Sequence, residues 1–152
     1  YGYAFHNMSE FLRIGFETYG PFNIHYIPIN IYYQYLYYPF PVREDFLMGG
    51  SLFLLSPLFF AALYGLWKNR HKASPWILFL TINLVNIPIL LLMGTGWQQF
   101  GPRYTLDFIA PMMLLTAQGC CYIPKWLIKV LVAISIVHYL IGTLIYIIGP
   151  AV

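Results

Sequence analysis

Long apolar stretches, separated by short polar links, make up the last two thirds of this chain. Four mainly apolar windows run over residues 46–67, 75–93, 102–123 and 126–148. A helix needs roughly 20 such residues to cross the hydrocarbon layer of a membrane, and short links imply antiparallel neighbours in one bundle. The pattern therefore predicts an all-α fold in which residues 46–152 form an integral membrane bundle of about four transmembrane helices.

The first 45 residues carry a different pattern. A capping-box spacing that begins at Asn7 predicts a short helix to about Thr18, Gly20 predicts a turn, and a second short helical or irregular stretch follows over 28–38. Nine of the fourteen tyrosines lie in this region. Because tyrosine combines an apolar ring with a polar hydroxyl, residues 1–45 are predicted to form an aromatic-rich extracytoplasmic loop with short helices. The loop lies at the membrane interface, caps the bundle, or does both.

The amino-acid composition predicts that most of this chain is surrounded by lipid rather than water. The chain is 60% hydrophobic and 9% charged, whereas soluble domains carry roughly 25% charged residues. A water-soluble protein of 152 residues could not bury so much apolar surface. The formal charge of +3 is small, and no basic cluster is interleaved with aromatics in a water-facing segment, so nucleic acid is not an expected partner. The chain opens at Tyr1 without a signal peptide, and we expect it to be a fragment of a longer protein.

The positions of Lys and Arg predict the orientation of the bundle. The link at 68–72 and the link that ends in Lys125, together with Lys129 one turn into the next helix, hold five basic residues and no acid, whereas all five acidic residues fall elsewhere. Short cytoplasmic loops are enriched in Lys and Arg, so both links are predicted to be cytoplasmic. The N- and C-terminal ends and the loop around Trp97 are then extracytoplasmic. All four tryptophans lie at predicted helix ends, which is the headgroup level of a membrane.

The most informative polar residues lie in GTGWQQFGPRYTLDFIAP, residues 94–111. Gly101 and Pro102 predict a helix start, with Arg103 and Asp107 on one face of that helix. A guanidinium beside the N–H groups of a helix N-terminus favours phosphate. Arg103 is therefore a candidate to receive a lipid-linked phosphate at the outer interface. The alternative is an Arg–Asp pair that anchors the helix among lipid headgroups.

Other polar residues inside the windows have structural and functional interpretations. Asn83 and Asn86 share a face of the second window, and intramembrane amides usually bond across helices. His138 lies in the fourth window, where a histidine is either a packed, hydrogen-bonded residue or a functional one. Three prolines can kink their helices: Pro57, Pro88 and Pro111. No motif for nucleophilic catalysis, phosphate cradling or metal binding is present, and no metal or cofactor is expected.

The stretch GTGWQQFGPRYTLDFIAPMMLL resembles the late region of bacterial GT-C glycosyltransferases, the group that includes the dolichyl-phosphate-mannose protein mannosyltransferase-like proteins. The shared features are Gly-Trp, then Phe-Gly-x-Arg-Tyr, then an acidic residue or proline and an apolar helix. The Tyr- and Pro-rich loop before it, and the window that begins at Gly49, Gly50 and Ser51, are also similar. The likeness covers most of residues 20–115.

The resemblance implies an enzyme of the bacterial cytoplasmic membrane that takes a sugar from a polyprenyl-phosphate donor on the extracytoplasmic side. In that family the catalytic base is an acidic residue of an outer loop that would lie upstream of this chain. The resemblance places Arg103 near the donor phosphate, with four further residues shaping the outer cavity: Trp97, Gln99, Tyr104 and Asp107. The alternative, suggested by the prolines and midplane polar residues, is a non-enzymatic membrane protein such as a transporter half or an assembly subunit.

Overall fold

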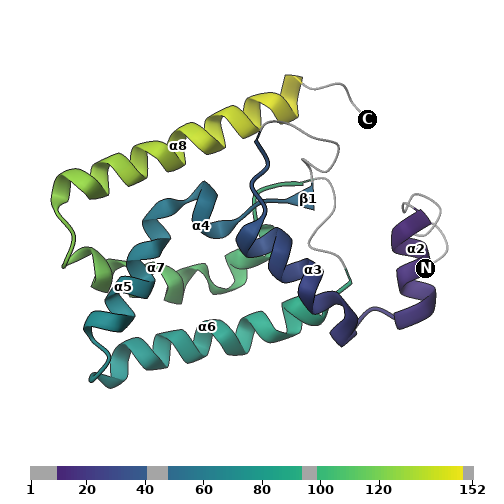
Figure 1. Cartoon of the computed structure of the whole chain (residues 1–152), viewed down its shortest axis with the longest axis horizontal. Helices are drawn as coiled ribbons and strands as arrows, with labels where there is room; N and C mark the ends of the chain where they lie inside the picture. Colours follow the sequence, from purple (N-terminus) through teal and green to yellow (C-terminus); the bar gives the residue numbers. More distant parts are fainter. Residues whose placement is uncertain (1–9, 41–47, 94–98, 149–152) are drawn as a thin grey trace.

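The computed structural model describes residues 10–40, 48–93 and 99–148, and helices dominate it (Figure 1). The first part of the chain contains α2 (Glu10–Tyr19), the 3-10 turn η1 (Ile24–Tyr26), α3 (Ile27–Ile31) and the π-helix η2 (Tyr32–Leu36). The middle part contains β1 (Met48–Gly49), α4 (Leu52–Leu55), the 3-10 turn η3 (Pro57–Phe59), α5 (Phe60–Lys68) and α6 (Ala73–Leu91). The last part contains β2 (Gln99–Phe100), the 3-10 helix η4 (Arg103–Phe108), α7 (Ile109–Cys120) and α8 (Lys125–Ile148).

Two helices, α6 and α8, are long and apolar enough to cross a membrane. They contain 19 and 24 residues, and only 17% and 6% of their apolar windows are buried against the rest of the chain. The central helix of a water-soluble protein would be mostly covered, so this exposed apolar surface suits a lipid environment. The structure thus confirms a mainly helical chain with two helices that can span a membrane.

The predicted spans at 46–67 and 102–123 are broken into shorter helices, so a bundle of four continuous spans is not confirmed. In the first, Pro57 has no N–H to donate, and Ser56 leaves helical geometry at φ −127° and ψ 72°. In the second, α7 has only 12 residues. At about 1.5 Å per residue it covers about 18 Å, which is less than the roughly 30 Å of a hydrocarbon core.

Close packing of α5 against α7 forms the centre of the bundle. A Cβ atom on Gly65 would lie 2.7 Å from the Cα of Gly119, and a Cβ on Gly119 would overlap the carbonyl of Ala61. Small residues let two helix backbones approach this closely, and in lipid such packing is a main source of helix association. Around this contact lies a core of buried apolar residues: Leu52, Ala62, Ile82, Phe108, Met112 and Leu115.

The two basic links lie at the same end of the molecule. In Figure 1 the α5–α6 and α7–α8 connections are both at the left, whereas α2 and the C-terminal end of α8 are at the right. The hydroxyl of Tyr122, in the second link, donates to Oδ1 of Asn69, in the first, over 2.7 Å. The predicted topology requires these links to share one side. Which side faces the cytoplasm stays a prediction.

The aromatic loop caps the C-terminal end of α6. The backbone N–H of Asn23 donates to the Leu91 carbonyl over 2.9 Å, and the buried Asn30 amide donates to the carbonyls of Leu90 and Leu92 over 2.9 and 2.8 Å. The last carbonyls of a helix have no partner within it, so the loop supplies the missing donors. This geometry agrees with the capping interpretation of the first 45 residues.

The local predictions for this loop are largely confirmed. Helix α2 ends at Tyr19, and Gly20 follows with φ 74°, a left-handed conformation that glycine adopts without strain. The hydroxyl of Tyr26 then donates to the carbonyls of Gly15 and Gly20 over 2.9 and 2.8 Å. The segment 28–38 is helical through Leu36. The proposed cap at Asn7 lies outside the described residues.

Candidate functional site

A short parallel β pair brings two distant parts of the sequence together. Met48 pairs with Gln99, and Gly49 pairs with Phe100. Gly49 and Gly101 have φ values of 121° and 85°, which side chains rarely permit. The pairing therefore places the backbone that precedes α4 beside the turn that leads into Arg103.

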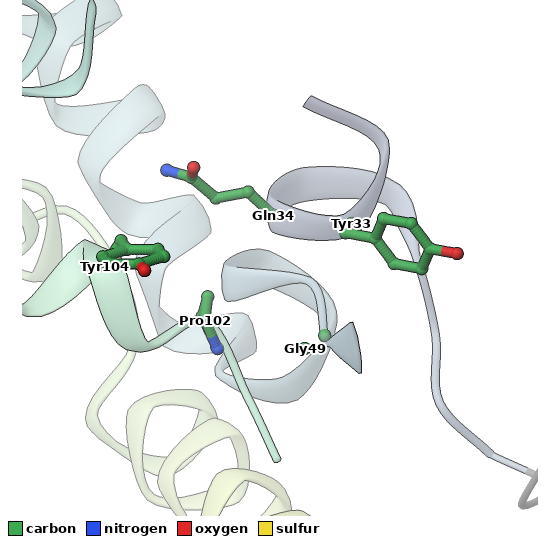
Figure 2. Close-up of a pocket in the computed structure, with 6 residues that line it drawn as sticks. Tyr33, Gln34, Gly49, Pro102 and Tyr104 are labelled. Atoms are coloured by element: carbon green, nitrogen blue, oxygen red, sulfur yellow. The ribbon is translucent and has the colours of Figure 1, made fainter. Parts of the chain in front are cut away.

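A small cavity lies at this junction. It is lined by residues of the π-helix η2, the β1 segment and the start of η4: Tyr33, Gln34, Gly49, Gly50, Pro102 and Tyr104. Figure 2 shows Gln34 and Tyr33 leaving the π-helix in opposite directions, with Pro102 between Tyr104 and Gly49. The volume of the cavity is about 10 Å³, which is close to the minimum that a single water molecule needs.

Buried hydrogen bonds hold one wall of this cavity. The Gln34 amide donates to Oδ1 of Asn86 over 2.8 Å and to the Tyr35 hydroxyl over 3.0 Å. The Asn86 amide donates to the same hydroxyl over 2.8 Å. Burial raises the pKa of Tyr35 to about 12, so this hydroxyl stays protonated at neutral pH. The network joins the aromatic loop to α6 and fixes the position of Gln34.

Ser51 holds the other side of the junction. Its hydroxyl donates to the Tyr35 carbonyl over 2.5 Å and accepts from the N–H of Leu54 over 3.1 Å, as an N-cap of α4. Its own N–H donates to the Tyr37 carbonyl over 2.7 Å. Since Ser51 is fully buried, these bonds tie the π-helix to the start of α4.

Arg103 projects from a fixed turn. The Arg103 N–H donates to the Gly101 carbonyl over 3.1 Å, and the buried Thr105 donates to the Pro102 carbonyl through both its N–H and its hydroxyl, over 3.0 and 2.6 Å. The Arg103 side chain is exposed, and Tyr104 is partly buried where it lines the cavity. The turn therefore presents a guanidinium to the surface beside the cavity.

The predicted shared helical face of Arg103 and Asp107 is wrong. Both residues lie in η4, a 3-10 helix, and α7 starts only at Ile109. At about 3.0 residues per turn, side chains four apart point in different directions. Both side chains are exposed, and no ion pair joins them in the part of the chain that the structure describes. The predicted position of Arg103 at an α-helix N-terminus is wrong for the same reason.

The remaining predicted site residues are only partly placed. Trp97 lies outside the described residues, and Gln99 is described by its backbone, which pairs with Met48 in the β pair. Gln34 and the backbone of Gly49 and Gly50 also line the cavity, although the sequence pattern did not predict them as site residues. A usable signal for Gln34 was that it is the only amide side chain within the tyrosine run YYQYLYY, residues 32–38.

His138 joins three parts of the fold. Its Nδ1 lies 3.3 Å from the Leu55 carbonyl, and its Nε2 lies 3.0 Å from the Tyr38 hydroxyl. A carbonyl only accepts, so Nδ1 is assigned as the donor. The break at Ser56 leaves the Leu55 carbonyl without its usual partner, because the Phe59 N–H donates to Ser56 instead. These contacts favour the structural interpretation of His138, a packed and hydrogen-bonded histidine, over a functional one.

Among the described residues no group of three or more His, Cys, Asp or Glu side chains gathers as a metal site would require. Asn83 donates only to the Phe79 carbonyl of its own helix, over 2.7 Å. Together with the buried network of Asn86, this favours the structural interpretation of the polar residues in α6.

No protein-family model, no curated protein and no solved structure matches this chain.

Proposed function

We propose that this chain is part of an integral membrane glycosyltransferase that takes a sugar from a polyprenyl-phosphate donor on the extracytoplasmic side. The observation that carries the proposal is Arg103, an exposed cation on a hydrogen-bonded turn beside a cavity lined by Gln34 and Tyr104. The turn precedes α7, whereas the basic link 121–125 follows it. Arg103 thus belongs to the end of α7 that is remote from the predicted cytoplasmic links.

The chemistry of such a transfer gives Arg103 a specific role. The acceptor oxygen attacks C1 of the sugar while the bond from C1 to the phosphate oxygen breaks, and the phosphate leaves with the electron pair of that bond. A guanidinium presents two parallel donors that match two phosphate oxygens. Placed where charge develops on the leaving group, it lowers the barrier. A base takes the proton of the acceptor, and we assign that role to none of the residues of this chain.

The size of the cavity restricts where the donor would lie. A space of about 10 Å³ holds a water-sized group and excludes a sugar. We therefore place the donor phosphate on the open surface over Arg103 and Tyr104, with the cavity and its Gln34 amide behind that surface. Asp107 is exposed and unpaired with Arg103, so the guanidinium would not have to leave a carboxylate to bind phosphate.

A transporter half receives less support from the same residues. The polar side chains that would line a pathway, Asn83, Asn86 and His138, donate to or accept from groups of the protein itself. Groups engaged in this way are expected to stabilise the bundle rather than bind a passing solute.

Replacing Arg103 with Ala is expected to weaken binding of polyprenyl monophosphate about tenfold or more, because a charge-assisted hydrogen bond to phosphate is worth about 1.5–3 kcal/mol. Native mass spectrometry of the purified full-length protein measures this binding without knowledge of the sugar. Transfer from a polyprenyl-phosphate-linked sugar should fall in parallel, with membrane insertion unchanged.

Lys129→Ala is the matched control, since it also removes one exposed basic side chain but lies in the first turns of α8. It should bind polyprenyl monophosphate as the unmodified protein does. If Arg103→Ala binds and transfers normally, the role of Arg103 at the donor phosphate is wrong.

A further inference from the structure

A hollow lies at the basic end of the bundle, where α5 leads into α6. It is lined by Trp67, Lys68, Arg70 and His71, and its volume is about 250 Å³. The volume is open to the surface and is far larger than the cavity beside Arg103. It therefore has room for a group of several heavy atoms.

The link that forms this hollow is held by hydrogen bonds on both sides. Asn69 is buried, and its amide donates to the Gly65 carbonyl over 3.1 Å while its Oδ1 accepts from Tyr122. The indole of Trp76 donates to the Arg70 carbonyl over 2.8 Å. The backbone that carries the lining cations is thus fixed to α5, α6 and the second basic link.

The two cations of the lining are oriented by neighbouring rings. The Lys68 ammonium lies 4.9 Å from the ring centroid of Trp67 and 5.5 Å from that of Tyr64, which is cation–π geometry. The Arg70 Nε donates to Nε2 of His71 over 3.2 Å. This bond uses one of the five donors of the guanidinium and leaves its terminal amino groups for a ligand.

The positive charge of this end has no acidic partner in the neighbouring sequence. From residue 46 to the end of the chain the only acid is Asp107, which lies in η4 at the far end of α7. Lys68, Arg70 and Lys72 are exposed within five residues, and Lys125 and Lys129 follow in the adjoining helix. An anion in the hollow would therefore meet no repelling carboxylate from these elements.

We propose that this hollow binds the headgroup of an anionic phospholipid. Phosphate is the chemistry that a guanidinium and an ammonium on a fixed loop recognise. A lipid is favoured over a soluble phosphate because the hollow lies where α5 leads into α6, a helix that can span a membrane, and because an exposed tryptophan, Trp67, lines it. Basic residues near a membrane surface attract anionic lipids. The inference requires membrane insertion and does not depend on the glycosyltransferase proposal.

The test compares phosphatidylglycerol with phosphatidylcholine by native mass spectrometry of the detergent-purified full-length protein. The unmodified protein should retain phosphatidylglycerol in preference. In the double variant Lys68→Gln and Arg70→Gln this preference should fall by about 30-fold, about fivefold for each lining cation that pairs directly with the headgroup phosphate. Lys125→Gln removes a charge at the same end outside the lining, and it should lower the preference no more than about twofold.

Three results would overturn the proposal. A loss of about fivefold from Lys125→Gln, as large as the share expected of each lining residue, would show a diffuse electrostatic attraction rather than a site. Displacement of the lipid by millimolar inorganic phosphate would show that the hollow recognises soluble phosphate. An unchanged preference in the double variant would show that the hollow holds no lipid.

Discussion

Replacing Gly119 with Val is expected to lower the free energy of unfolding by about 3 kcal/mol, at the upper end of the usual cost of overpacking. Any side chain at this position overlaps the Ala61 carbonyl, and the next atom it would meet is the backbone N of Gly65, 3.1 Å away. Backbone atoms cannot turn aside as a flexible side chain can. α5 and α7 would have to separate, and the buried residues around Leu115 would lose contact.

The measurement is thermal or denaturant-induced unfolding of the purified protein in one detergent. Ala117→Val introduces the same residue on the exposed side of the same helix, and it should change stability by less than about 0.5 kcal/mol. Gly65→Ala should destabilise in the same direction as Gly119→Val. If Gly119→Val unfolds like the unmodified protein, α5 and α7 do not pack as the structure describes.

Asn86→Leu is expected to cost about 2 kcal/mol, since it leaves buried polar groups without a partner. The substitution removes the acceptor of the Gln34 amide and one of the two donors to the Tyr35 hydroxyl. In this network the Gln34 amide and the Tyr35 hydroxyl would keep only the hydrogen bond between them. Because these residues position the aromatic loop on α6, that loop should also become more accessible to protease.

Asn83→Leu is the matched control, three residues earlier on the same helix. Its amide bonds only to the Phe79 carbonyl of α6 itself, and that carbonyl already belongs to the helix ladder. Unfolding should therefore be little changed, and loop proteolysis should be unchanged. Equal effects of the two substitutions would mean that Asn86 does not hold the loop.

Local patterns predicted much of the helical structure. The apolar windows at 75–93 and 126–148 correspond closely to α6 and α8, because each is long, uncharged at its centre and bounded by a basic link. Gly20 predicted the end of α2. In these places a property of a few neighbouring residues is sufficient to determine the backbone.

Contacts between residues far apart in the sequence could not be predicted from these local patterns. Asn30 donates to carbonyls about 60 positions later, Gln34 bonds to Asn86, and His138 bonds to the Leu55 carbonyl. A hydropathy pattern carries no information about such pairs. The break at Ser56 was also missed, because an apolar window containing Pro57 permits either a kinked helix or two separate ones.

The local geometry around Arg103 differs from the prediction. Gly101 and Pro102 predicted the start of an α-helix, whereas the 3-10 helix η4 begins at Arg103 and α7 begins only at Ile109. Arg103 is exposed on η4. The 3-10 geometry of η4 was not predicted. Thr105 stabilises it through two hydrogen bonds, from its N–H and its hydroxyl, to the Pro102 carbonyl. The partners of this turn in the cavity come from segments 50 to 70 residues earlier, Gly49 and Gln34 among them.

Accessibility of single cysteines tests the central claim most directly, namely that the basic links and the Arg103 turn lie on opposite sides of a membrane. The two free cysteines, Cys120 and Cys121, are first replaced by Ala. Arg70→Cys and Arg103→Cys then each place one thiol at an exposed position, and intact cells are treated with a membrane-impermeant maleimide. Labelling of the cysteine at 103 alone, with the cysteine at 70 labelled only after lysis, is the predicted result. Labelling of both in intact cells, or of neither, would contradict it.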